Sequence, residues 1–197
     1  MNAASAIGQS VFEFASRALP ARATRLAVHH SSATPEHYTP RDVLLLVERV
    51  FGGIPDLDPC SNSHTHPNVT ARRHYTQADN GLAQPWSGRV FLNPPYGKEV
   101  LPPWIRKLRT EWRRGEMTEL IALLPARPDT RWFYRVTLEA DALCFIQQRL
   151  KFVGNTSGAP FPSMLIYFGP RREVFIDAFR DRGTFWQQES QLDRGGV

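Results

Sequence analysis

The sequence of 197 residues has only two cysteines, Cys60 and Cys144, which excludes a disulfide framework and favours a reducing cytoplasm. It has no run of about 18 apolar residues, so we expect no membrane-spanning helix. Its first residues lack a basic segment followed by a continuous apolar core, which argues against a secretory signal. What remains is a composition with 42% hydrophobic and 22% charged residues, typical of a globular protein.

The charge balance points to a polyanionic partner. The formal net charge is +5 and the sequence pI is about 9.6, which fits nucleic acid as a partner. Three basic clusters could line a track for phosphates: residues 71–73 (ARR), 106–114 (RKLRTEWRR) and 170–172 (PRR). For the second cluster, a solvated helix face is an alternative, because its charges recur around the helix.

The length of the chain favours one domain with its own core. We predict a single domain over residues 36–190. An extension rich in alanine, serine and arginine precedes it at residues 1–35 and is expected to be loose, and a short tail follows at 191–197. No internal repeat is visible.

Apolar runs alternate with stretches of helical spacing. The segment YTPRDVLLLVERVFGG predicts an amphipathic helix with Thr39 as N-cap, Pro40 in the first turn and Gly52-Gly53 as the stop. A short buried strand is expected to end at Asp58-Pro59. Further strands are predicted at 88–92, 119–125, 142–147 and 163–169, and further helices at 99–116, 129–140 and 172–183. This order predicts an α/β fold with a mostly parallel sheet covered on both faces.

The stretch FLNPPYG, residues 91–97, ends one of these strands. Two adjacent prolines cannot continue a sheet, because neither has an N–H to donate, so the strand should end at Asn93. A short, stiff loop then presents a carboxamide and the aromatic ring of Tyr96. Because ligands bind outside the carboxyl ends of parallel strands, we expect Asp58 and Asn93 to share one pocket.

Five motifs in this order resemble the phage-type (Dam-like) DNA N6-adenine methyltransferases, which use S-adenosylmethionine. The motifs are YTP at 38–40, LDPCS at 57–61, DNGL with a tryptophan at 79–86, FLNPPYG at 91–97 and RLKF at 149–152. The resemblance covers residues 38–168. It implies a Rossmann-like methyltransferase three-layer sandwich, DNA as partner, and no metal.

The resemblance also implies catalytic roles for Asn93, Pro94, Pro95 and Tyr96. The side-chain oxygen of Asn93 and the carbonyl of Pro94 would accept the two N–H bonds of an adenine amine, and these contacts would tighten as the nitrogen gains positive charge. Tyr96 would stack on a base rotated out of the duplex. Phe152 would hold the other face of that base, or would belong to the core instead.

Seven residues are implied to bind the cofactor: Tyr38, Thr39, Asp58, Pro59, Cys60, Asp79 and Asn93. Thr39 would lie at a helix N-terminus that suits the carboxylate of the methionine moiety, with Tyr38 packed beside it. Asp58 would face the ammonium group or the ribose, and Asp79 the adenine amine. Pro59 and Cys60 would shape the turn.

Two features depart from the broader methyltransferase pattern. The turn after Asp58 has no glycine, and only about thirty residues separate the first strand from the Asn93 strand, too few for two complete strand–helix units. We therefore expect a sheet trimmed relative to the full seven-stranded form, with the ribose contact left to Asp79, Asn80 or backbone groups. With no separate target-recognition domain, DNA reading falls to the loop at 153–162 or to the N-terminal arm.

Other interpretations remain open at this point. The same tetrapeptide occurs in enzymes that methylate a protein glutamine or the N2 amine of RNA guanine, and a non-catalytic DNA-binding protein could retain this scaffold. Asp79-Asn80-Gly81 is also typical of a simple turn. The cysteine and histidines at 60, 64, 66 and 74 do not have the spacing of a standard zinc site.

Overall fold

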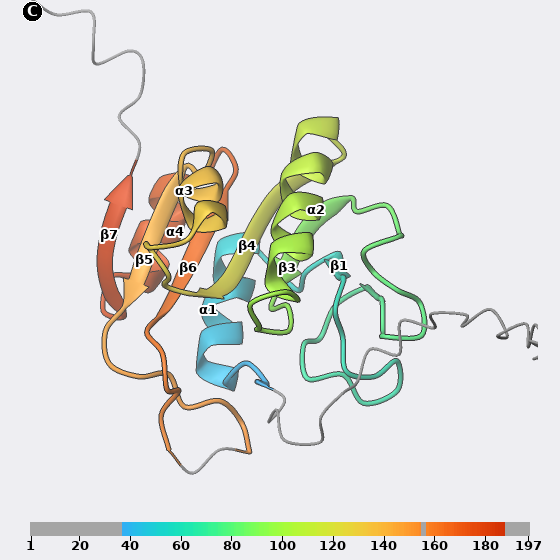
Figure 1. The fold of residues 1–197 in the computed structure, drawn as a ribbon, viewed down its shortest axis with the longest axis horizontal. Helices are drawn as coiled ribbons and strands as arrows, with labels where there is room; N and C mark the ends of the chain where they lie inside the picture. Colours follow the sequence, from blue (N-terminus) through green and yellow to red (C-terminus); the bar gives the residue numbers. More distant parts are fainter. Residues whose placement is uncertain (1–36, 155–156, 188–197) are drawn as a thin grey trace, which may run out of the picture. The chain divides into compact units, whose positions relative to one another are not determined.

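The computed structural model describes residues 37–154 and 157–187 (Figure 1). All of these residues belong to one unit that begins at Pro35. The predicted extension at 1–35 and the tail at 191–197 both lie outside the described residues. The single domain over 36–190 stays a prediction.

One sheet of seven strands forms the centre of this unit, in the order β2-β1-β3-β4-β6-β5-β7. The strands are β1 (Leu57–Asp58), β2 (Arg73–His74), β3 (Gly88–Leu92), β4 (Met117–Pro125), β5 (Ala142–Ile146), β6 (Ser163–Phe168) and β7 (Gly183–Gln187). The pairings among β2, β1, β3 and β4 are parallel, and those of β6 with β4 and β5 and of β7 with β5 are antiparallel. The sheet is therefore mixed: β2, β1, β3, β4 and β5 run in one direction and β6 and β7 in the other. The prediction of a mostly parallel sheet holds for strand direction, but it missed the antiparallel placement of β6 between β4 and β5.

Helices cover both faces of the sheet, as the α/β prediction requires. Helices α1 (Arg41–Phe51) and α4 (Arg172–Phe179) pack on one face, and α2 (Leu101–Arg114) and α3 (Arg131–Thr137) on the other (Figure 1). Each face has its own buried cluster, one around Val47 and Phe175 and one around Leu108 and Val136. Within the described residues, no helix is both long and apolar enough to cross a membrane.

The prediction of a trimmed sheet was wrong in the number of strands, which is seven. The segment between β1 and β3 is too short for two complete strand–helix units, and it accommodates β2 because its connections lack helices. Residues 59–72 join β1 to β2, residues 75–87 join β2 to β3, and neither contains a helix. Strands β1 and β2 are only two residues long, and β2 and β7 were not predicted. The parallel pairing of β1 with β2 and β3 nevertheless brings the ends of β1 and β3 to one edge.

The start of α1 differs by one residue from the prediction. Pro40, not Thr39, is the N-cap, and its carbonyl accepts the first backbone bonds from Val43 and Leu44. Thr39 does not cap the helix because its hydroxyl accepts a hydrogen bond from the Asn93 amide instead. The predicted stop is confirmed: Gly52 is the C-cap, with the positive φ of 68° that favours glycine.

Candidate functional site

The candidate site lies where β1, β3, β4 and β5 reach their carboxyl ends, at one edge of the sheet. Asn93 follows β3 and its amide is bonded on every side. Its Nδ2 donates to the His37 carbonyl at 2.7 Å and to the Thr39 hydroxyl at 2.9 Å. Its Oδ1 lies 2.8 Å from the Tyr96 hydroxyl. Because the His37 carbonyl can only accept, these contacts fix which end of the amide is oxygen.

The loop after Asn93 carries both its acceptor and its ring inward. Pro94 is buried, and within residues 37–154 and 157–187 no hydrogen bond reaches its carbonyl oxygen. The Tyr96 hydroxyl also lies 3.0 Å from the carbonyl of Leu123 in β4. Tyr96 thereby fixes the loop to the neighbouring strand and holds the Asn93 oxygen in place. Burial raises the pKa of the Tyr96 hydroxyl well above its usual range.

An aromatic cluster forms around Tyr96, and two of its members were not predicted. The His37 ring stacks on Tyr96, with centroids 5.3 Å apart and an angle of 28° between the planes. Phe152 lies 4.7 Å from the His37 ring, and Phe161 meets Tyr96 edge-on at 5.3 Å. Phe152 is only 2% exposed and belongs to the core. His37 directly precedes the motif at 38–40, and Phe161 lies in the loop at 153–162 that the sequence suggested for DNA reading; neither residue was singled out by itself.

The His37 ring is held by packing alone. Its Nδ1 is buried and has no hydrogen-bond partner among the described residues. Burial lowers the pKa of the His37 imidazole, so the ring is neutral at neutral pH. A neutral, flat ring therefore occupies a stacking position beside Tyr96.

The exit of β1 meets the exit of β3 through Cys60. The Cys60 thiol donates to the Asn93 backbone carbonyl at 3.1 Å, which confirms that the two predicted strand ends converge. Asp58 is 4% exposed and accepts a bond from the Cys60 backbone N–H at 3.2 Å. Burial raises the pKa of the Asp58 carboxyl to about 7. This carboxyl therefore titrates near neutral pH at the end of β1.

A close backbone contact places the segment at 79–82 against the β1 exit. A Cβ on Gly81 would lie 1.9 Å from the Pro59 carbonyl oxygen, so only glycine fits this approach. The Trp86 indole, which is fully buried, donates to the Gly81 carbonyl at 2.9 Å and anchors the turn. The glycine and tryptophan of this motif thus have a structural role that explains their spacing.

Asp79 uses its carboxylate within this same loop. Its Oδ2 accepts from the Thr76 N–H and the Thr76 hydroxyl, both at 2.7 Å, and lies 2.7 Å from His64 Nε2. The hydrogen bonds from Thr76 lower the pKa of Asp79 to about 2. These bonds are those of a turn, the alternative that the sequence left open, and the cofactor role of Asp79 stays a prediction.

The segment at 37–39 closes the site from the side of α1. Thr39 is 1% exposed, and its carbonyl accepts from Asn68 Nδ2 at 3.1 Å. Tyr38 forms an isolated bridge with Val153, whose N–H donates to the Tyr38 carbonyl at 2.9 Å. The structure therefore brings every predicted site residue to the same edge, from five separate parts of the chain.

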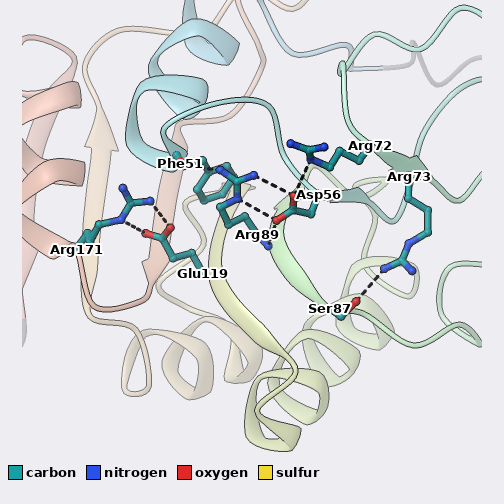
Figure 2. Close-up of polar contacts among 8 residues, drawn as sticks. All are labelled: Phe51, Asp56, Arg72, Arg73, Ser87, Arg89, Glu119 and Arg171. Carbon is teal, nitrogen blue, oxygen red and sulfur yellow. Dashed lines mark hydrogen bonds and ion pairs between the residues drawn. The ribbon is translucent and has the colours of Figure 1, made fainter.

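Two of the predicted basic clusters lie at the opposite edge of the sheet and are occupied by contacts within the protein (Figure 2). Arg89, at the start of β3, pairs with Asp56 through two bonds of 2.9 Å, and Arg72 joins the same carboxylate at 3.2 Å. Arg73 bonds to Ser87 at 2.9 Å. Arg171 pairs with Glu119, which is buried at the start of β4.

Most of the remaining cluster, residues 106–114 on α2, is paired as well. Lys107 and Arg114 contact Glu111 at 2.7 and 2.9 Å, and Arg109 and Arg113 both pair with Glu139. These cations stabilise the fold and lie away from the Asn93 edge. The three clusters named from the sequence therefore give no phosphate track beside the site.

A zinc site finds no support in the described residues, which contain no group of three or more histidine, cysteine, aspartate or glutamate side chains able to hold a metal ion. His74 lies 2.9 Å from the Val69 carbonyl, and His64 pairs with Asp79. These histidines hold the long loops between β1 and β3, which have no helix to support them.

Comparison with known proteins assigns the chain to a family. A search of curated proteins gave no match. The family model described as DNA N-6-adenine-methyltransferase (Dam) matches residues 30–177, which is most of the chain and contains every residue of the site described above. The chain belongs to the DNA N-6-adenine-methyltransferase (Dam) family.

Proposed function

We propose that this protein is an S-adenosylmethionine-dependent DNA methyltransferase that transfers a methyl group to the N6 amine of adenine. The observation that carries this proposal is the placement of Asn93 and Pro94 at the end of β3, beside the end of β1. The Cys60 thiol joins the two strand ends, and Cys60 lies two residues after the buried Asp58. A target and a cofactor bound at these neighbouring strand ends would meet. Membership of the family supplies the reaction class.

The chain's own contribution is to hold the target amine. An adenine amine is a weak nucleophile because its lone pair is delocalised into the ring. Two acceptors on its N–H bonds favour the pyramidal form and stabilise the charge that develops on nitrogen. The Pro94 carbonyl accepts no bond from the described residues, and the Asn93 oxygen accepts one from Tyr96 and retains a second lone pair. Both acceptors therefore have capacity for the amine.

The residues at the end of β1 fit the cofactor. When bound, S-adenosylmethionine supplies an activated methyl group on a sulfonium. Asp58 is a buried carboxyl that accepts the Cys60 N–H at 3.2 Å and interacts with the Ser61 side chain, and its two oxygens have capacity for a further ammonium or hydroxyl donor. Pro59 and Cys60 would shape the same pocket. The Thr39 hydroxyl accepts a hydrogen bond from the Asn93 amide, and we assign Thr39 to positioning that amide.

The target base would need the stacking surface of Tyr96. His37 already stacks on that ring at 5.3 Å, so a base on the same face would displace the His37 side chain. Phe161, which meets Tyr96 edge-on, belongs to the loop from which we expect part of the DNA reading. Base stacking of this kind is worth about 1–3 kcal/mol per base.

A transfer assay tests the proposal. The full chain is incubated with S-adenosylmethionine labelled in its methyl group, together with DNA, RNA or a release-factor protein in separate reactions, and product nucleosides are examined by mass spectrometry. We expect label in DNA alone and N6-methyladenine as the product. Label only in protein or only in RNA would overturn the assignment. Absence of both label and calorimetric binding of the cofactor would favour a non-catalytic DNA-binding protein.

A further inference from the structure

The described cations divide sharply into paired and unpaired groups. Of the twenty lysines and arginines in residues 37–154 and 157–187, twelve form an ion pair with a carboxylate. Arg73 is bonded to Ser87. Seven have no side-chain hydrogen bond or ion pair within the described part of the chain: Lys98, Arg106, Arg127, Arg131, Arg135, Arg149 and Lys151.

Five of these seven follow the carboxyl ends of three strands that run in the same direction. Lys98 follows β3, Arg127 and Arg131 follow β4, and Arg149 and Lys151 follow β5. Strand β5 runs parallel to β4 because each pairs antiparallel with β6. All five side chains are exposed. We call these five residues the cationic rim. Strand β5 ends at the edge of the sheet from which the loop after β5 extends in Figure 1.

Contacts tie the cationic rim to the aromatic cluster around Tyr96. Lys98 is two residues beyond Tyr96, and Lys151 directly precedes Phe152, which packs on His37. Arg127 follows Ala126, whose N–H donates at 2.8 Å to the carbonyl of Pro162, next to Phe161 in the chain. Arg149 begins the same loop. The unpaired cations thus lie in the three loops that follow β3, β4 and β5 and lead into or contact the aromatic cluster.

The rim has little compensating negative charge. Glu99 and Asp129 are interspersed in these segments, and Asp42 and Asp181 line a common hollow with Arg149 and Lys151, where Asp42 is paired with Arg182. Positive charge still exceeds negative charge around the rim. At the opposite edge, Asp56 and Glu119 each hold at least one arginine. A cation paired with a carboxylate is not free to neutralise a phosphate, whereas an unpaired exposed one is. Repulsion among unpaired cations is relieved when a polyanion binds.

We propose that the cationic rim binds backbone phosphates of the DNA on both sides of the extruded adenine. This rests on the proposed function, since it names the part of the chain that holds the DNA at that same site. The rim replaces the three clusters that the sequence suggested. Phosphate contacts of this kind position the duplex and carry no sequence information themselves.

Salt-dependent binding tests the rim. The variant R149Q/K151Q removes two rim charges, and R72Q/R113Q removes two charges that are equally exposed but ion-paired at the opposite edge; Arg89 still neutralises Asp56, and Arg109 still neutralises Glu139. Binding of a short fluorescein-labelled duplex is followed by anisotropy between about 50 and 200 mM salt. Thermal unfolding of each variant verifies the fold.

Each phosphate contact contributes about 0.9 to the slope of log K against log salt. We expect R149Q/K151Q to lower that slope by about 2 and to weaken binding about 30-fold at physiological salt. R72Q/R113Q should change affinity less than about 3-fold, because its arginines are already neutralised. Equal slopes in the two variants, or no binding of DNA by the unaltered protein, would contradict the proposal that the cationic rim binds DNA phosphates. DNA binding that depends on the rim without any methyl transfer would instead overturn the proposed function alone.

Discussion

Replacement of Asn93 by alanine should separate the structural role of this amide from its chemical role. The side chain makes three hydrogen bonds, to His37, Thr39 and Tyr96. At about 1 kcal/mol each, their loss should lower the free energy of unfolding by about 3 kcal/mol. Loss of one oriented acceptor in the transition state should lower the rate of methyl transfer by about 10²–10³. Affinity for the cofactor should change much less, because Asn93 is assigned chiefly to the target amine.

Two matched variants make the prediction sharp. Asn93→Asp keeps an oxygen facing Tyr96 but places a second acceptor against the His37 carbonyl, so it should lose about 1–3 kcal/mol of stability and keep transfer within about 10-fold. Thr39→Val removes a single acceptor and should cost about 1 kcal/mol with little change in rate.

Chemical denaturation and single-turnover transfer at saturating cofactor measure these two quantities separately. The reasoning would be refuted by full turnover in Asn93→Ala. It would also be refuted if Asn93→Asp lost as much rate as Asn93→Ala, because the retained oxygen would then contribute nothing.

Three further predictions concern the surroundings of the site. The Asp58 carboxyl has its pKa raised to about 7, so between about pH 4 and 7 it keeps its proton in the folded state while the unfolded chain has lost it. The free energy of unfolding should therefore fall by up to about 4 kcal/mol as pH rises through this range, and cofactor binding should tighten. Asp58→Asn should flatten both pH profiles. The pH dependence of stability expected from Asp56 has the opposite sign, because Arg89 lowers the pKa of this carboxyl to about 2. Its contribution of about 2 kcal/mol to the free energy of unfolding is present above pH 4 and lost towards pH 2. Asp56→Asn should remove this loss of stability at low pH in unfolding titrations. Gly81→Ala should cost about 2–3 kcal/mol in denaturant unfolding, because its Cβ meets the Pro59 carbonyl, whereas Gly97→Ala, with its nearest contact at 3.4 Å, should be nearly neutral; equal effects would contradict the close approach.

The parts of the fold with strong local patterns could be predicted from sequence. The limits of β3 were correct because a glycine precedes this apolar run and two prolines follow it. Strand β2 has two residues and β7 is mostly exposed, so neither carries a buried apolar pattern. Without them, the strand count could not be derived. The mixed pairing arises mainly from β6, whose antiparallel pairing with β4 and β5 joins segments far apart in the chain.

The site, too, was predictable in part only. Convergence of Asp58 and Asn93 followed from the rule that parallel strands end at one edge. The contacts that hold the site could not be predicted, because they join residues far apart in the chain, as the Asn93 amide and the His37 carbonyl do. The same is true of ion pairs elsewhere in the fold, such as that of Arg109 with Glu139. A run of arginines in sequence reports charge but not whether a distant carboxylate has already neutralised it.

The amide of Asn93 bridges a chain separation of 56 residues to the carbonyl of His37. The geometry of the reactive corner therefore depends on a segment that precedes the first helix and adds almost nothing to the sheet. A shortened chain that begins after Thr39 should still build the seven strands, yet its key amide would keep only one of its three partners, Tyr96. Such a protein would be folded, stable enough to purify, and inert.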